Sequence, residues 1–180
     1  MRILLIANKN PFPPKDGGSI ATLNMALGLA DAGASVTLLS INTPKHFFST
    51  EAIPTEIAQK INLQSVFVDT SISIWKLLLN LIISKKPYNA VRFINKEFRC
   101  KIEALLLETQ FDLVQLEGLY LAPYIQTIRA NSDARIALRA HNVEHQIWQL
   151  LARQAKNPLK KVYLQTLARR VKKMEIETLG

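Results

Sequence analysis

The sequence begins with RILLIA at residues 2–7, an apolar run that predicts the first strand of a sheet buried on both faces. A polar, proline-rich stretch follows as NKNPFPPKD at residues 8–16, and GGS at residues 17–19 then opens a helical pattern. In open α/β sheets, ligands bind at the carboxyl ends of the strands. The order of strand, glycine turn and helix therefore marks a candidate binding edge.

The glycine turn itself allows two interpretations. Gly17 and Gly18 have no Cβ, so their backbone can adopt unusual dihedral angles and approach a ligand closely. The helix is expected to start near Ser19, where free N–H groups favour a phosphate or another anion. An ordinary turn capped by the Ser19 hydroxyl explains the same residues, and the local pattern does not decide between the two.

Apolar runs alternate with helical patterns along the rest of the chain. The predicted strands are 34–41, a short strand within 61–68, 111–116 and 135–140. The predicted helices are 19–32, 74–84, 95–109, 120–130, 143–155 and one from Pro158 to about Leu179. Strands separated by helices pair in parallel with right-handed crossovers. We therefore expect an α/β fold with a doubly wound, mostly parallel sheet and helices on both faces.

Composition points to one globular domain in a reducing compartment. The chain has 180 residues, of which 48% are hydrophobic, enough for a substantial core. Its lone cysteine, Cys100, excludes an internal disulfide and fits the cytoplasm. The most apolar stretch, residues 72–83, is interrupted by Lys76 and Asn80, so no segment is expected to span a bilayer.

Positive charge is concentrated at the end of the chain. The net charge is +9, and residues 151–180 carry eight basic and two acidic side chains. Within the last predicted helix, an apolar stripe faces away from most of the basic residues; the stripe is Leu164, Leu167, Val171 and Met174. This pattern fits a helix that binds a polyanion or an anionic membrane surface, and it fits equally a solvated helix face.

Two further groups of polar residues follow predicted strands. RAHNVEH at residues 139–145 contains His141, whose pKa near neutrality suits acid–base chemistry or hydrogen bonding, although a packing or capping role explains it equally well. Glu117 and Gly118 end the strand before it, and Glu117 is a candidate for binding hydroxyl groups. Three residues of the first loop add hydroxyl-binding capacity at the same edge: Asn8, Asn10 and Asp16.

Several familiar sites are missing from the sequence. His141 and His145 do not form a His-Glu-x-x-His zinc motif, because Glu144 directly precedes His145, and we expect no metal. There is no Gly-x-Gly-x-x-Gly after the first strand, no P-loop and no Gly-x-Ser-x-Gly elbow. These absences disfavour a dinucleotide cofactor, and with it an epimerase or dehydrogenase, a P-loop NTPase and a serine hydrolase.

The order of these motifs resembles the N-terminal domain of the family 4 retaining glycosyltransferases, which have the GT-B fold. The resemblance is carried by residues 2–19, 26–40, 111–120, 139–148 and 157–179. It implies one Rossmann-like half of a two-domain enzyme, with residues 1–180 as the acceptor-side domain and the nucleotide-sugar domain lying outside this chain. Relatives often have histidines where this chain has Leu116-Glu117-Gly118, a departure that puts a direct active-site role for Glu117 in doubt.

The resemblance also implies roles for individual residues. His141 matches a histidine near the transferred sugar and is the expected catalytic residue. Gly17 and Gly18 match the turn that approaches the donor diphosphate or the acceptor, and the remaining expected substrate-binding residues are Asp16, Glu117 and Asn142.

The resemblance further implies the partners of the protein. The implied ligands are a nucleotide-sugar donor and a sugar or lipid-linked acceptor. We expect no cofactor and no nucleic-acid partner, and a cytoplasmic location that extends to the inner membrane face if the basic helix meets lipid. The apolar stripe of the last helix is expected to be partly exposed and available for contact with a second copy. The alternative is a non-catalytic α/β module that binds anionic partners through its basic helix.

Overall fold

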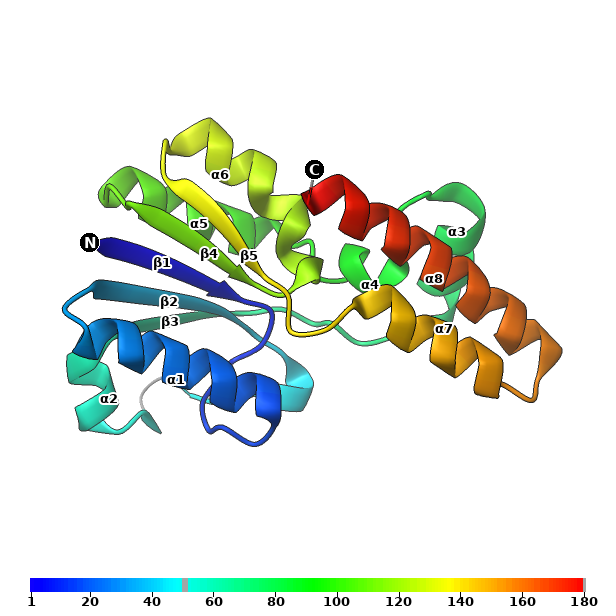
Figure 1. Cartoon of the computed structure of the whole chain (residues 1–180), viewed down its shortest axis with the longest axis horizontal. Helices are drawn as coiled ribbons and strands as arrows, with labels where there is room; N and C mark the ends of the chain where they lie inside the picture. The colour runs from blue at the N-terminus through cyan, green and yellow to red at the C-terminus, as the bar shows by residue number, and fades with distance from the viewer. Residues whose placement is uncertain (50–51, 180) are drawn as a thin grey trace.

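The protein is built around one sheet of five parallel strands, seen in a computed structural model that describes residues 1–49 and 52–179 (Figure 1). The strand order is β3-β2-β1-β4-β5. The strands are β1 (Arg2–Ala7), β2 (Ser35–Asn42), β3 (Asn62–Phe67), β4 (Leu113–Glu117) and β5 (Arg135–Arg139). The predicted α/β fold class with a parallel sheet is therefore confirmed.

The central position of β1 brings the predicted polar positions together. In the parallel register, Ala7 lies opposite Glu117 of β4, and Glu117 lies opposite Arg139 of β5. The ends of β1, β4 and β5 consequently meet at one edge of the sheet, where the chain order reverses from the β1–β2–β3 side to the β4–β5 side. Ligands bind at such a switch point in open α/β sheets.

Helices cover both faces of the sheet. One face carries α1 (Gly17–Asp31) and α2 (Thr55–Lys60), and the other carries α5 (Lys96–Glu108) and α6 (Ile125–Asn131) (Figure 1). A short 3-10 helix η1 (Pro44–His46) follows β2, and a second one, η3 (Leu119–Tyr124), follows β4. The remaining helices are α3 (Ile74–Ile83), α4 (Tyr88–Val91), α7 (Glu144–Gln154) and α8 (Pro158–Leu179).

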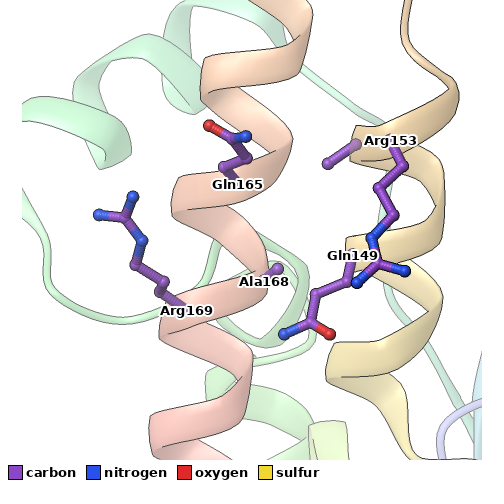
Figure 2. A pocket seen from close by; sticks show the side chains of 6 residues that line it. Gln149, Arg153, Gln165, Ala168 and Arg169 are labelled. Atoms are coloured by element: carbon purple, nitrogen blue, oxygen red, sulfur yellow. The ribbon is translucent and has the colours of Figure 1, made fainter.

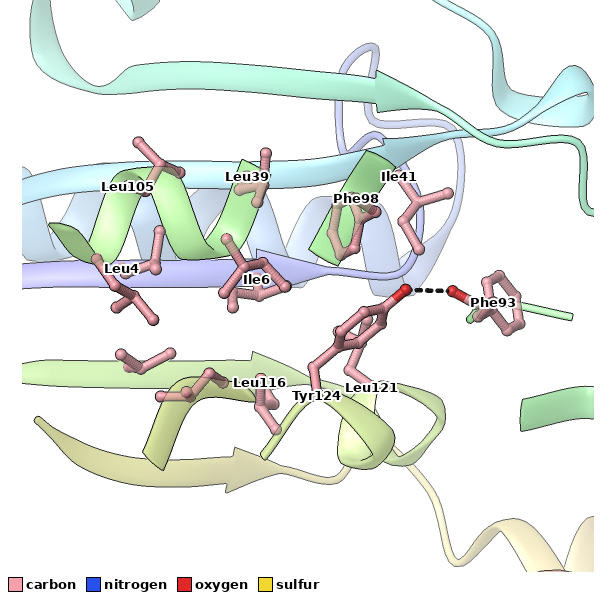
Figure 3. Packing of buried hydrophobic residues seen from close by; sticks show 14 of the residues in the cluster. Leu4, Ile6, Leu39, Ile41, Phe93, Phe98, Leu105, Leu116, Leu121 and Tyr124 are labelled. Atoms are coloured by element: carbon pink, nitrogen blue, oxygen red, sulfur yellow. Dashed lines mark hydrogen bonds between the residues drawn. The ribbon is translucent and has the colours of Figure 1, made fainter. Parts of the chain in front are cut away.

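The larger hydrophobic core lies between the sheet and the α5–α6 side. Alternate residues of β1 and β2, such as Leu4 and Leu39, pack there against α5 (Figure 3). Tyr124 is 1% exposed, and its hydroxyl donates to the Phe93 carbonyl at 2.7 Å. Its ring contacts Phe98 edge to face, with the ring centroids 5.3 Å apart. The hydrogen bond to Phe93 allows this large aromatic side chain to be buried without leaving its hydroxyl unpaired.

The face under α1 differs from the prediction. The helical spacing predicts an inward face with Ile20, Leu23, Leu27 and Ala30, and Leu23 is buried as predicted, but Ile20 is 46% exposed. Ser19 and Thr22 are buried instead. The apolar stripe that the helical spacing predicted is therefore wrong at its first position, because the first turns of α1 lie over the polar strand ends rather than over the apolar sheet.

The last two helices form an antiparallel pair beyond the carboxyl edge of the sheet (Figure 1). Leu167 and Val171 of α8 are buried against Leu119 of η3, and Met174 packs beside them. Leu164 is also buried. The predicted stripe is thus covered within the chain, and the expectation that it is left exposed is wrong. In residues 1–49 and 52–179, no helix is both long and apolar enough to cross a membrane.

Candidate functional site

A cleft of about 620 Å³ lies at the carboxyl edge of the sheet. Four segments contribute to it: the loop after β1, the first turns of α1, the end of β4 with η3, and the segment between β5 and α7. The predicted site residues that line it are Asp16, Gly17, Gly18, Glu117, His141 and Asn142. Asn8 also lines the cleft, whereas Asn10 is 2% exposed and does not.

The first turn of α1 is capped by Asp16, and not by Ser19, the cap that one of the two interpretations of this turn required. The Asp16 carboxylate accepts from the Ser19 backbone N–H at 3.0 Å and from Lys9 Nζ at 2.5 Å. The Lys9 hydrogen bond, reinforced by the one from Ser19, lowers the pKa of Asp16 from 3.8 to about 2. Asp16 thus satisfies one of the free N–H groups at this helix end and adds a negative charge beside it.

Gly17 and Gly18 lie in the first turn of α1 and do not use the unusual dihedral angles that glycine allows. Only Gly33 and Gly118 have positive φ in the described chain. A Cβ on Gly17 would meet no atom within 4 Å, whereas a Cβ on Gly18 would lie 3.3 Å from Lys9 Nζ and 3.4 Å from Asp16 Oδ1. Gly17 therefore leaves open space at the helix end, and Gly18 makes room for the Lys9–Asp16 pair.

Glu117 forms the floor of the cleft and is the centre of a polar network. Its side chain is 1% exposed. Oε1 accepts from Gln115 at 2.5 Å, and Oε2 accepts from the Thr22 hydroxyl at 3.1 Å. Oε2 also lies 3.1 Å from Arg139 and 3.0 Å from His141 Nε2. A buried carboxylate requires such compensation, because leaving it unpaired in a low-dielectric interior is costly.

Sequence reasoning missed three members of this network: Thr22, Gln115 and Arg139. Thr22 and Gln115 were given no role, and Arg139 was named in the 139–145 segment without a role of its own. The parallel register supplies the signal, since it places Arg139 directly beside Glu117. Arg139 also donates to the Ala21 carbonyl at 3.2 Å, which ties β5 to α1.

His141 lies beside Glu117, with its side chain 26% exposed. Because a carboxylate oxygen accepts hydrogen bonds, the ring nitrogen facing it, Nε2, carries the hydrogen. The neutral ring then keeps Nδ1 as its acceptor. His145 faces the opposite way, with Nδ1 2.5 Å from Glu175 of α8, so the two histidines do not form a pair. No group of three or more potential metal ligands occurs within residues 1–49 and 52–179.

Another polar group forms the wall of the cleft nearest to α7. The Tyr120 hydroxyl donates to Glu144 at 2.8 Å and accepts from Trp148 Nε1 at 3.0 Å. Burial, reinforced by the negative charge of Glu144, raises the pKa of Tyr120 well above its usual value. The first backbone N–H groups of α7, from Glu144 and His145, donate to the Glu175 carboxylate at 2.8 and 3.2 Å. The N-terminus of α7 is thus occupied by Glu175, whereas the N-terminus of α1, where Asp16 caps the Ser19 N–H, lines the cleft.

A second, smaller hollow of about 280 Å³ lies between α7 and α8 (Figure 2). Ala152 and Ala168 form its buried floor, and Arg153 and Arg169 lie on its two sides. Small residues at this crossing allow the two helices to approach closely. None of the predicted site residues contributes to it.

Comparison with known proteins finds a distant likeness only. No protein-family model and no curated protein matches the chain. Among solved structures, the chain resembles the E. coli heptosyltransferase WaaC with ADP-2-deoxy-2-fluoro heptose, at 16% identity and a TM-score of 0.33. The alignment covers 100% of this chain and 49% of that chain, so the chain spans about half the length of the heptosyltransferase. At this identity and TM-score, the similarity does not indicate an activity for this chain. The function of the cleft is therefore inferred from the cleft's own geometry.

Proposed function

We propose that this chain is the N-terminal, acceptor-side domain of a GT-B glycosyltransferase of the family 4 type, which transfers a sugar from a nucleotide-sugar to an acceptor hydroxyl with retention. The observation that carries this proposal is the meeting of His141, Glu117 and the N-terminus of α1 in one cleft. A helix N-terminus favours an anionic group such as a phosphate. Polar side chains beside it suit the hydroxyl groups of a sugar.

In this mechanism, the nucleotide diphosphate leaves and the acceptor hydroxyl attacks the same face of the sugar. Backbone N–H groups of the first turn of α1 stabilise negative charge in the cleft. His141, oriented by Glu117, contacts a sugar hydroxyl or stabilises the developing charge. Asp16 and Asn142 supply polar contacts at the rim. A second domain after this chain supplies the remaining contacts to the nucleotide.

The test is turnover by the full-length protein with a panel of nucleotide-sugars, measured as nucleotide release. His141→Ala is expected to lower kcat by about a hundredfold, the scale of one catalytic acid–base or charge-stabilising group. His145→Ala is the matched control, because His145 faces Glu175 and does not line the cleft. Equal activity of folded His141→Ala and wild-type protein would contradict the role of His141.

The competing function is a non-catalytic module that binds anions through α8. It is favoured by the exposure of Arg169, Lys172 and Lys173 on the outer side of this helix. The turnover assay separates the two functions, since a binding module releases no nucleotide with any donor.

A further inference from the structure

Helix α3 presents its apolar side chains to the outside of the molecule. None of its residues is buried. Trp75, Ile82 and Ile83 are 78%, 82% and 78% exposed. The other exposed apolar side chains of this face are Ile72, Ile74, Leu78 and Leu79. Monomeric soluble proteins rarely leave such a contiguous apolar face open to water, so it indicates an interaction surface.

The outward orientation of α3 is fixed by polar contacts on its inner side. Arg170 of α8 donates to the Leu81 carbonyl at 2.7 Å and to the Asn80 carbonyl at 3.2 Å. At the other end, the Ser73 hydroxyl caps the helix, and the Ser73 backbone N–H donates to the Tyr88 hydroxyl at 3.2 Å. The inner side of α3, with half-buried Leu77, Asn80 and Leu81, is thus bound to the protein body, and most of its apolar side chains are left outside.

Basic side chains predominate in the segment that carries this face; acidic neighbours are Asp69, which interacts with Lys76, and Glu177, which lines a hollow with Lys85 and Lys86. Residues 70–96 contain five basic side chains and no acidic one. Lys76 lies within α3, and Lys85 and Lys86 follow directly after it; all three are exposed. An apolar helix face with a tryptophan and adjoining lysines fits the interface of an anionic bilayer, where indole and alkyl groups enter the headgroup boundary and ammonium groups stay at the surface.

We propose that the outer face of α3, comprising Trp75, Leu78, Leu79, Ile82 and Ile83 with Lys76, Lys85 and Lys86, is a docking surface for membranes that contain anionic lipid. The helix lies in the plane of the interface, because ten residues extend only about 15 Å, half of a hydrocarbon core. The apolar side chains insert below the headgroups, and the lysines bind lipid phosphates. This contact is separate from the cleft and does not depend on glycosyl transfer.

Helix α8 is the competing membrane surface, and its contacts favour it less. Its apolar stripe is buried in the protein, so it has no comparable face to insert. Its lysines also lie among acidic residues: Lys173 is 3.6 Å from Glu177. We therefore assign membrane contact to α3 rather than to the basic terminal helix.

The experiment is co-sedimentation of the 180-residue chain with phosphatidylcholine vesicles and with vesicles that also contain phosphatidylglycerol. Wild-type protein is expected to bind the anionic vesicles and to bind neutral ones more weakly. Trp75→Ser/Ile82→Ser is expected to lower the affinity by at least about tenfold, because two large apolar side chains no longer leave water. Leu159→Ser/Val162→Ser is the matched control, since these α8 residues are 81% and 61% exposed.

The charge contribution is tested with a second pair of variants. Lys85→Glu/Lys86→Glu is expected to lower affinity for anionic vesicles about thirtyfold, at about 1 kcal/mol per basic residue near such a surface. Lys172→Glu/Lys173→Glu on α8 should lower the affinity less than the α3 pair, because Lys173 lies beside Lys85 and Lys86 in one hollow but its helix has no apolar face to insert. A larger loss in the α8 pair than in the α3 pair would overturn the assignment.

Fluorescence locates the contact directly. The chain has two tryptophans, and Trp148 is held by Tyr120 on the cleft side. Brominated lipids are expected to quench wild-type fluorescence and to leave Trp75→Phe largely unquenched. Absence of vesicle binding by wild-type protein would overturn the proposal. So would a concentration-dependent dimer, seen by analytical ultracentrifugation, that Trp75→Ser/Ile82→Ser abolishes, since the face would then belong to a second copy.

Discussion

Glu117 is the residue on which the polar side of the cleft depends. It is buried, yet both of its oxygens are occupied by donors from neighbouring elements. The carboxylate therefore holds Arg139 and His141 in place, and a direct contact with a substrate hydroxyl stays a prediction. Removing one partner from such a buried pair usually destabilises a protein, because the other charge is left uncompensated.

We expect Glu117→Gln to lower the free energy of unfolding by about 2 kcal/mol, less than for a fully buried pair because Arg139 remains 30% exposed. Urea denaturation measures this change. Glu108→Gln, an exposed glutamate at the end of α5, is the control and should change stability by less than about 0.5 kcal/mol. If Glu117→Gln were as stable as wild type, the charge of Glu117 would make no net contribution to the free energy of unfolding.

Asp16 makes the stability of the folded protein depend on pH, with a sign that follows from its lowered pKa. The pKa of Asp16 in the folded protein, about 2, lies below its ordinary value of 3.8, so the ionised form stabilises the protein above pH 3.8, and this contribution is lost as the pH falls through about 2. The side chain is 41% exposed, so solvent screening limits the contribution to less than about 1 kcal/mol. Asp16→Asn should keep the cap, and its stability deficit should shrink between pH 5 and 2. A deficit independent of pH would contradict the Lys9–Asp16 pairing.

At the scale of elements, the turn from β4 into η3 depends on a single glycine. Gly118 has φ 110° and ψ 150°, a conformation that residues with a Cβ rarely adopt. This turn lets the chain leave the sheet beside Glu117 and enter η3, which carries Tyr120 into the cleft wall. Gly17 and Gly18 allow unusual backbone dihedral angles without using them, whereas Gly118 requires one.

We expect Gly118→Ala to lower the free energy of unfolding by about 1–3 kcal/mol through backbone strain. Packing does not explain the loss, because the added Cβ would meet only Asn8 Nδ2, at 3.5 Å. Gly28→Ala, in the middle of α1 with open space around it, should instead stabilise by about 0.5–1 kcal/mol. Thermal or urea denaturation of the two variants gives opposite signs if this interpretation is correct.

The sequence predicts long periodic elements well and short or polar ones poorly. Helix α5 and strand β2 fall within about one or two residues of the predicted bounds, because their apolar periodicity is strong. The short helix α2 was missed, since none of its residues is buried and no apolar pattern marks it. The predicted helix over 120–130 is a 3-10 turn followed by α6, because Pro123 disfavours α-helical geometry in the residue before it.

The candidate site was predictable in its location but not in its internal contacts. All six predicted site residues line one cleft, because strand ends in a parallel sheet share an edge. The network around Glu117 needed the strand register and the rotation of α1, which bring Thr22 and Arg139 to the same oxygen. No local sequence pattern encodes contacts between residues 95 positions apart in the chain.

At the scale of the whole molecule, the cleft is lined by the strand ends of one sheet and by the loops and helices that follow them. We expect the 180-residue chain alone to show no nucleotide release with any nucleotide-sugar, because the proposed second domain supplies the remaining diphosphate contacts. Loss of one such donor typically lowers a rate by about 10²–10³. Saturable turnover by the purified chain would show that its site is complete and that the two-domain proposal is wrong.

Because Arg139 lies on the edge strand β5, its ion pair with Glu117 in the cleft depends on the stability of the sheet edge. Within residues 1–49 and 52–179, no strand pairs with the outer edge of β5, and edge elements open more readily than central ones during native-state fluctuations. Each opening of β5 withdraws Arg139 from Glu117 and displaces the following segment, which carries His141. The fraction of molecules with an assembled cleft is therefore set by the local opening equilibrium of one strand, and amide hydrogen exchange in residues 135–139 would report that fraction. A partner strand that pairs with the outer edge of β5 would stabilise this strand. It would thereby raise the fraction of molecules with an assembled cleft without contacting the cleft.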